Sequence, residues 1–359
     1  MSTDKFLFLV LRNKKINDFE IIDKLISSFS DCGYWFDKIA YIDYSNSQSI
    51  VQAIEEGKSG FENLVIYYPI EMDNILKSHI EKSYSTKFND NNCLSADNKS
   101  VFLLGADDNC KLEVSHIAEV LNKKYGKSYL HAYVKTVGAP GNKISEALAK
   151  AKEVCGDVDF CVREKYGECS IELIYESDIP KSVYDSVIRA LLEVLNDYVY
   201  ALEDITLAER FVQLLKLRRM KICVAESFTG GGVGKRLVEV PGVSEVFYEG
   251  LNTYSNQSKS DRLGVKEQTL KQFGAVSEQT AAEMAEGLIV NGSCDVSIST
   301  TGIAGPNSDN TKKPVGLFYI GIATKENVQV YKYNLKGSRK SITETAINFA
   351  LFLAYKSIK

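Results

Sequence analysis

Val224-Ala-Glu-Ser-Phe-Thr-Gly-Gly-Gly-Val-Gly-Lys235 is the most informative stretch of this 359-residue sequence. A short apolar run ends at Ser227, and the glycines from Gly230 onward then predict a tight turn into a helix. Strand-to-helix turns of this kind are typical of α/β folds. Backbone N–H groups at such a turn can hold an anion or the developing oxyanion of a reacting carbonyl group.

Two phosphate-binding motifs are excluded by counting residues. A P-loop needs a glycine five residues before the Gly-Lys pair and a hydroxyl residue after it, but Thr229 and Arg236 occupy those positions. A dinucleotide fingerprint needs a glycine where Lys235 stands. Two interpretations of the turn remain. Ser227 is a nucleophile, or Ser227 or Thr229 only caps the helix.

A serine nucleophile in this part of the chain would need a base other than histidine. The three histidines all lie before residue 132, so unless another domain supplies the base, the remaining option is a lysine kept neutral by burial or by neighbouring cations, as in Ser-Lys hydrolases. Tyr254-Ser-Asn-Gln-Ser-Lys259 supplies such a lysine, with Tyr254 beside it, just after a predicted strand at Gly250–Tyr254. The alternative is a surface lysine on a polar loop.

The remaining elements from residue 200 onward also alternate between strand and helix patterns, which predicts a three-layer α/β domain over residues 200–359. Loops at the carboxyl ends of strands in such a sheet bind ligands. The predicted substrate-binding residues lie in the first turn, in Thr301-Gly-Ile-Ala-Gly-Pro306 and in Gly337-Ser-Arg339. They are Thr229, Gly230, Gly231, Thr301, Gly302, Gly305 and Arg339.

Two further domains are predicted before this one. In residues 1–127, short apolar runs such as Phe6–Leu11 and Asn63–Tyr68 alternate with helical patterns, which predicts a parallel sheet covered on both faces, with Tyr84–Asn98 as a loop. Residues 128–199 predict a small α+β module. Its Gly138-Ala-Pro-Gly141 matches the GXXG loop of RNA-binding KH domains, but no basic run follows, which favours a structural turn.

The amino-acid composition argues against several classes of function. A net charge of −4 and a pI near 5.7 argue against nucleic acid as the main partner, and no apolar run is long enough to cross a membrane. Eight cysteines without paired spacing predict reduced thiols in a cytoplasmic protein, and they suggest neither a metal site nor a cofactor. A small-molecule substrate is expected, and a homodimer is the default assembly.

The C-terminal motifs together resemble the C-terminal domain of the CinA family (competence/damage-inducible protein A). They occur in family order as AESFTGG (225–231), PGVS (241–244), YSNQSK (254–259), LGV (263–265), GAVSE (274–278), TGIAGP (301–306), KPVG (313–316) and GSR (337–339). Phe228 and Ser338 depart from the usual cysteine and aspartate. The resemblance implies hydrolysis of nicotinamide mononucleotide to nicotinic acid mononucleotide and ammonia, a step of pyridine nucleotide and NAD recycling. It also implies Ser227 as nucleophile, Tyr254 and Lys259 as proton-transfer partners, and Arg339 as a phosphate ligand.

The resemblance extends more weakly toward the N-terminus. The middle module is similar to the KH-type module of full-length CinA proteins, and residues 1–127 stand where those proteins carry a molybdopterin-binding-like domain with ADP-ribose pyrophosphatase activity. Leu11-Arg-Asn-Lys14 and Tyr68-Pro-Ile-Glu-Met-Asp-Asn74 replace the family's loops and leave only Asp73 as an acidic ligand, so this activity is expected to be lost. Two other functions stay open: an amidase acting on a different nucleotide, and a non-catalytic binding or assembly protein.

Overall fold

The computed structural model describes residues 5–12, 19–106, 110–291, 294–306 and 313–359, and it contains three β-sheets. Its contacts divide the chain into two compact units. One consists of residues 1–131 and 174–179, and the other of residues 132–173 and 180–359. The α/β fold class predicted from the sequence is confirmed. The division into three domains stays a prediction, because the contacts group the middle sheet with the C-terminal one.

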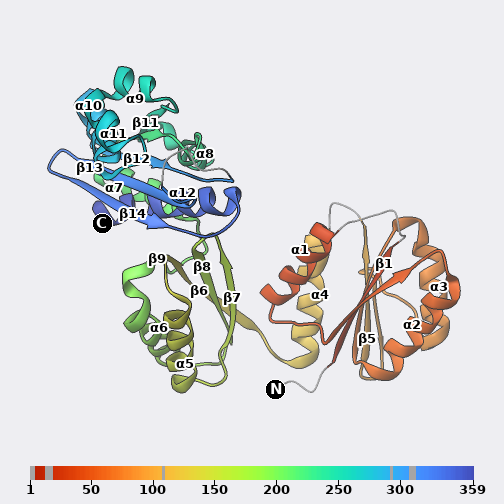
Figure 1. The fold of residues 1–359 in the computed structure, drawn as a ribbon. Helices are drawn as coiled ribbons and strands as arrows, with labels where there is room; N and C mark the ends of the chain where they lie inside the picture. Colours follow the sequence, from red (N-terminus) through yellow and green to blue (C-terminus); the bar gives the residue numbers. More distant parts are fainter. Residues whose placement is uncertain (1–4, 13–18, 107–109, 292–293, 307–312) are drawn as a thin grey trace. The chain divides into compact units, whose positions relative to one another are not determined.

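The N-terminal sheet has the strand order β2-β1-β3-β5-β4. Strands β2, β1, β3 and β5 are parallel to one another. The strands are β1 (Phe6–Arg12), β2 (Lys38–Asp43), β3 (Asn63–Tyr68), β4 (Cys93–Ala96) and β5 (Lys99–Gly105), and the helices are α1 (Phe19–Asp31), α2 (Ser47–Gly60), α3 (Asp73–Tyr84) and α4 (Cys110–Tyr125). Alternate side chains of β1 and β3 face opposite sides, so one core forms with α1 and α4 and another with α2 and α3 (Figure 1). The predicted covering of both faces is confirmed.

The prediction of a loop over Tyr84–Asn98 is wrong in part. The edge strand β4 lies inside it and pairs antiparallel with β5. Cys93 and Leu94 of β4 are buried, and this apolar pair was too short to be recognised beside the polar Asn89–Asn92 stretch.

The middle sheet has the order β7-β8-β6-β9. Its strands are β6 (Tyr129–Val137), β7 (Asp159–Lys165), β8 (Glu168–Glu176) and β9 (Val199–Ala201), and its helices α5 (Gly141–Val154) and α6 (Lys181–Leu195) pack side by side on one face (Figure 1). The Gly138 N–H donates to the carbonyl of Gly167 over 2.8 Å, and a side chain at Gly138 would contact the ring of Phe349. The first glycine of the GXXG turn thus has a contact within the protein, whereas Pro140 and Gly141 are exposed, so the interpretation of the turn as structural stays a prediction.

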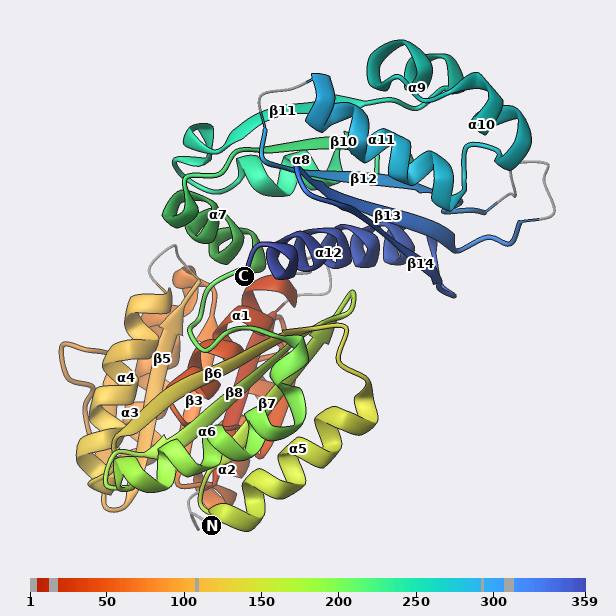
Figure 2. The same cartoon turned by 90° about the vertical axis from the view of Figure 1, so that its left-hand side faces the viewer.

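The C-terminal sheet has the order β11-β10-β12-β13-β14. The strands are β10 (Ile222–Glu226), β11 (Phe247–Asn252), β12 (Val296–Gly302), β13 (Leu317–Thr324) and β14 (Val328–Asn334), and the helices are α7 (Leu207–Arg218), α8 (Gly232–Val238), α9 (Asn256–Leu263), α10 (Glu267–Phe273), α11 (Glu278–Asn291) and α12 (Arg339–Ser357). Figure 2 shows α7 and α12 on one face of the sheet and α9, α10 and α11 on the other. The largest core lies between the sheet and α7, α8 and α12.

The strand directions place one end of this sheet at the predicted site. β11 and β12 both run parallel to β10, and their residues Asn252 and Thr300 pair with Glu226 at its end. β13 and β14 are antiparallel to their neighbours, so β14 also ends at this edge. The segments after β10, β11, β12 and β14 therefore meet at one edge, as the sequence predicts. β11 ends two residues earlier than expected, and Tyr254 lies beyond it.

A glycine lets α11 approach α9. A side-chain carbon at Gly287 would lie 1.9 Å from the carbonyl oxygen of Leu263, the last residue of α9. Because α9 carries Lys259, this close approach helps to fix the position of that lysine.

We expect Gly287→Ala to lower the free energy of unfolding by about 1–3 kcal/mol, because the added methyl group forces the two helices apart. Gly141→Ala is the matched control in the same unit, since nothing lies within 4 Å of the added carbon. Chemical denaturation of both variants measures the difference. Equal stabilities would show that the contact between α9 and α11 is loose.

Candidate active site

The amine of Lys259 lies against the hydroxyl of Ser227. Lys259 is fully buried on α9, and its Nζ is 3.0 Å from Ser227 Oγ. Nζ also donates to the backbone carbonyls of Thr253, over 2.7 Å, and Tyr254, over 3.2 Å. The geometry predicted for Ser227 and Lys259 is confirmed, and the alternative of a surface lysine on a loop is wrong.

These three contacts are compatible with either protonation state of Lys259. The three N–H donors of a protonated amine match the two carbonyls and Ser227 Oγ, whereas a neutral amine donates to the two carbonyls and keeps one lone pair for the Ser227 hydroxyl proton. Among the described residues no carboxylate forms an ion pair with Lys259. Burial without a counter-ion disfavours the charged form and lowers the pKa of Lys259 to about 8. A base that can lose its proton near neutral pH thus contacts the serine.

The carboxylate of Glu226 organises the turn after β10. It is buried and accepts the backbone N–H groups of Gly231, Val233 and Gly234 over 2.8–3.1 Å, together with the Thr229 hydroxyl over 2.7 Å. A carboxylate is favourable at the positive end of a helix dipole, so Glu226 takes the place of a helix cap for α8. No pattern in the sequence predicts this role for Glu226.

The Glu226 carboxylate excludes the interpretation that Ser227 or Thr229 caps the helix after the glycine-rich turn. Neither hydroxyl caps α8, because Glu226 accepts the amides at its start. The amides of Gly230 and Gly231 are engaged within the turn, so the predicted contact of these residues with substrate, which stays a prediction, would not use them. The Gly230 N–H donates to the carbonyl of Ser227, and the Gly231 N–H donates to Glu226. These glycines instead supply backbone with positive φ, at 63° and 94°.

Two amides of the turn stay available for a ligand. Within the part of the chain that the structure describes, the N–H groups of Phe228 and Thr229 have no acceptor, and both residues directly follow Ser227. Adjacent N–H groups beside a nucleophile are the usual donors to an oxyanion. The Thr229 hydroxyl is engaged by Glu226 and, over 2.6 Å, by the hydroxyl of Thr300, so only the amide of Thr229 remains as a ligand group.

Tyr254 contributes its backbone to the lysine site. Its side chain is 66% exposed, and the atom that contacts Lys259 is its carbonyl oxygen. The neighbouring Thr253 is buried, and its hydroxyl oxygen has no hydrogen-bond partner among the described residues. Thr253 was not recognised from the sequence, since a lone threonine after a strand carries no distinctive signal.

The loop after β12 contacts Arg339. Arg339 Nη1 donates to the carbonyl of Gly305 over 2.8 Å, so these two predicted residues lie together. The Thr301 hydroxyl, in contrast, donates to the carbonyl of Ala275 over 2.7 Å and is buried. A side chain at Gly302 would collide with Phe318 on the paired strand. Thr301 and Gly302 thus make contacts that hold the sheet and the loop together.

No group of three or more potential metal ligands occurs within the described residues. Cys223 and Cys294, far apart in the sequence, are both buried in one apolar cluster with Met284 and Leu288 of α11, and the Cys294 thiol donates to the carbonyl of Leu288 over 3.6 Å. Two thiols alone do not complete a tetrahedral metal site. Helices long and apolar enough to cross a membrane are also absent from the described part of the chain.

We expect Glu226→Gln to lower the free energy of unfolding by about 1–3 kcal/mol, because the amide –NH₂ faces N–H donors and leaves at least one of them unpaired. Glu239→Gln, at the exposed end of the same helix, is the control and should change stability by less than about 0.5 kcal/mol. Urea denaturation distinguishes the two. A Glu226→Gln protein as stable as the parent would contradict the capping role.

Comparison with known proteins supports the resemblance of the C-terminal region to the CinA C-terminal domain. Residues 204–358 match the family model described as the CinA C-terminal domain. A CinA-like protein from Kosmotoga olearia is 41% identical over 210 residues, 57% of this chain and 51% of that protein. A CinA-like protein from Fusobacterium nucleatum is 36% identical over 248 residues, 68% of this chain and 56% of that protein.

Among solved structures, the competence/damage inducible protein CihA from Agrobacterium tumefaciens is 35% identical with a TM-score of 0.40. The match covers 42% of this chain and 93% of that one. The chain spans little more than half the length of the curated relatives it matches. With its motifs in order and its C-terminal domain matched from residue 204 to residue 358, the chain belongs to the CinA family.

Proposed function

We propose that the C-terminal domain hydrolyses the carboxamide of nicotinamide mononucleotide, releasing ammonia and nicotinic acid mononucleotide. The observation that carries this proposal is the buried Lys259 amine 3.0 Å from Ser227 Oγ, without a carboxylate partner among the described residues. An amide carbon is a weak electrophile, so its hydrolysis needs an activated nucleophile and donors for the oxyanion. The site offers both.

In the first half of the reaction, neutral Lys259 takes the proton of Ser227 as Oγ attacks the carboxamide carbon. The amides of Phe228 and Thr229 stabilise the oxyanion of the tetrahedral intermediate. The C–N bond then breaks as Lys259 returns the proton to the departing nitrogen, which leaves as ammonia, and Ser227 is left acylated.

In the second half, a water molecule attacks the acyl group and Lys259 takes its proton. The ester bond to Ser227 breaks, the proton returns to Oγ, and the acid product leaves. The buried hydroxyl of Thr253 is suited to hold this water, since it has no other partner among the described residues. The exposed phenol of Tyr254 is proposed to contact the substrate and assist proton transfer.

Arg339 is proposed to bind the substrate phosphate. Its guanidinium is anchored through Nη1 to Gly305, which leaves its other N–H groups for an anion. This arrangement favours a nucleotide over an uncharged amide. A different nucleotide amide would fit the same contacts, so a panel of amides with and without a phosphate group decides the substrate.

A purely structural role for the C-terminal domain does not account for Lys259. Burying an amine without a counter-ion costs stability, and an apolar side chain would fill the same space at lower cost. The N-terminal domain is proposed to lack ADP-ribose pyrophosphatase activity. Its one remaining candidate ligand, Asp73, accepts a hydrogen bond from Tyr68 and forms an ion pair with Lys77, while Asn13 and Lys14 lie outside the described residues.

Ser227→Ala and Lys259→Met should each reduce ammonia release from nicotinamide mononucleotide by at least about 10³-fold, because each removes half of the nucleophile–base pair. The controls are Ser357→Ala and Lys271→Met, which change exposed residues on α12 and α10. A folded Ser227→Ala protein with near-normal turnover would rule out the serine mechanism. If ammonia were released only from other nucleotide amides, the substrate assignment would be wrong but the serine-lysine mechanism would still hold.

The rate should also follow the protonation of Lys259. Below its pKa of about 8 the amine is protonated and cannot accept the serine proton, so kcat/KM should rise about tenfold per pH unit from pH 6 and level off above about pH 8. Lys259→Arg should stay inactive at every pH, because a guanidinium does not lose its proton. Initial rates between pH 6 and 10 test this. A flat profile would exclude Lys259 as the base.

A further inference from the structure

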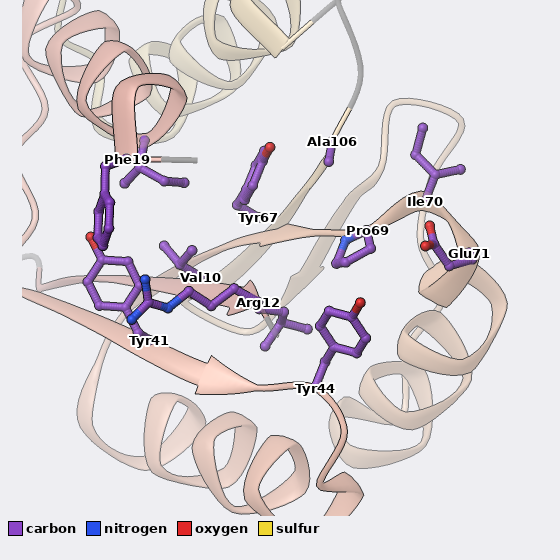
Figure 3. Close-up of a pocket in the computed structure, with 12 residues that line it drawn as sticks. Val10, Arg12, Phe19, Tyr41, Tyr44, Tyr67, Pro69, Ile70, Glu71 and Ala106 are labelled. Carbon is purple, nitrogen blue, oxygen red and sulfur yellow. The ribbon is translucent and has the colours of Figure 1, made fainter. Parts of the chain in front are cut away.

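The N-terminal domain contains a cavity of about 270 Å³ that the proposed amidohydrolase reaction does not use. Its walls come from the ends of β1, β2 and β3 and the segments that follow them. They include Arg12, Tyr41, Tyr44, Tyr67, Ile70 and Glu71. Figure 3 shows Arg12 beside Tyr41 at one end of the cavity, and Ile70 and Glu71 at the other.

The position of this cavity is the one where open α/β sheets bind ligands. The chain passes from β1 to β2 on one side and then to β3 on the other side of β1, so the topology switches direction between β1 and β3. Ligands bind outside the carboxyl ends of the strands at such a switch point. Arg12 ends β1, and Pro69 and Ile70 follow β3, which places the cavity at this switch point.

The side chains at the cavity indicate the chemistry of a ligand. The guanidinium carbon of Arg12 lies 4.5 Å from the ring centre of Tyr41 and 5.1 Å from that of Phe19, which hold the group by its faces. Its N–H groups form no ion pair or hydrogen bond with any described residue, so the edge of the guanidinium remains available for an anion. Tyrosine rings along the remaining wall offer surfaces on which a planar ring can stack.

From this geometry we propose that the cavity binds a planar aromatic anion, with its ring against the tyrosine wall and its phosphate or carboxylate group at Arg12. The volume limits the ligand. Pockets for drug-sized molecules measure roughly 300–1,000 Å³, so a cavity of 270 Å³ is small and fits one ring system with one anionic group. The exposure of Phe19 and Tyr41, at 47% and 43%, fits a site that is open to solvent at the Arg12 end.

The test uses the full chain and isothermal titration with adenosine 5′-monophosphate and with nicotinate, which carry a phosphate and a carboxylate respectively. Adenosine supplies a ring without an anion, and ribose 5-phosphate supplies an anion without a ring. We expect at least one aromatic anion to bind, and both incomplete probes to bind at least tenfold more weakly. Hydrogen exchange should show protection at residues 9–12, 41–44 and 67–71, which separates this site from the one at Ser227.

Arg12→Gln should weaken this binding at least tenfold, and Tyr41→Leu should weaken it with the charge intact. Lys38→Gln is the matched control, because Lys38 is an exposed cation at the opposite end of neighbouring β2. Absence of binding by both aromatic anions at 1 mM would overturn the proposal, as would binding that Arg12→Gln leaves unchanged or that protects only the C-terminal domain. Thermal denaturation of each variant confirms that it is folded.

Discussion

The contact between Lys259 and Ser227 is the interaction on which the proposed chemistry of the C-terminal domain depends. It joins residues 32 positions apart, and it exists only because β10 and β11 are parallel and end side by side. The segment after β11 places two backbone carbonyls beside the amine, and α9 carries the lysine into the interior. Close packing at Gly287 holds α9 there. Sheet register, helix packing and two backbone carbonyls therefore all act to position one desolvated amine.

Two buried ionisable groups near this edge are treated in opposite ways. Glu226 receives three amide N–H donors and one hydroxyl, which is a full set of partners for a carboxylate. Lys259 is buried among carbonyls and a hydroxyl without a counter-ion, and this burial lowers its pKa. The first group fixes the turn that carries Ser227, and the second is the proposed base. Both groups are buried, so their partners distinguish the structural role of Glu226 from the role proposed for Lys259.

The sequence predicts most strands and the edge at which they end, because apolar runs such as Val296–Thr300 are strong local signals. It does not predict α9, whose polar segment Asn256–Leu263 lacks an apolar stripe and is helical mainly through its Ser255 cap and its packing. It also misses Glu226, since a carboxylate that accepts amides five to eight residues ahead leaves no periodic pattern. The burial of Lys259 is equally invisible, because its neighbours in the sequence are polar and only tertiary packing encloses it.

The two larger sheets share one topological constraint. In each, the first strand lies between the second and the third, so a switch point forms at the end of the first strand whatever residues stand there. At the end of β10 the residues are Ser227 with a buried lysine, and at the end of β1 they are Arg12 with aromatic rings. Replacing a loop at such a place can remove chemistry, but the crevice follows from strand order and persists. For that reason the proposed loss of pyrophosphatase activity in the N-terminal domain is compatible with the proposed binding at its cavity.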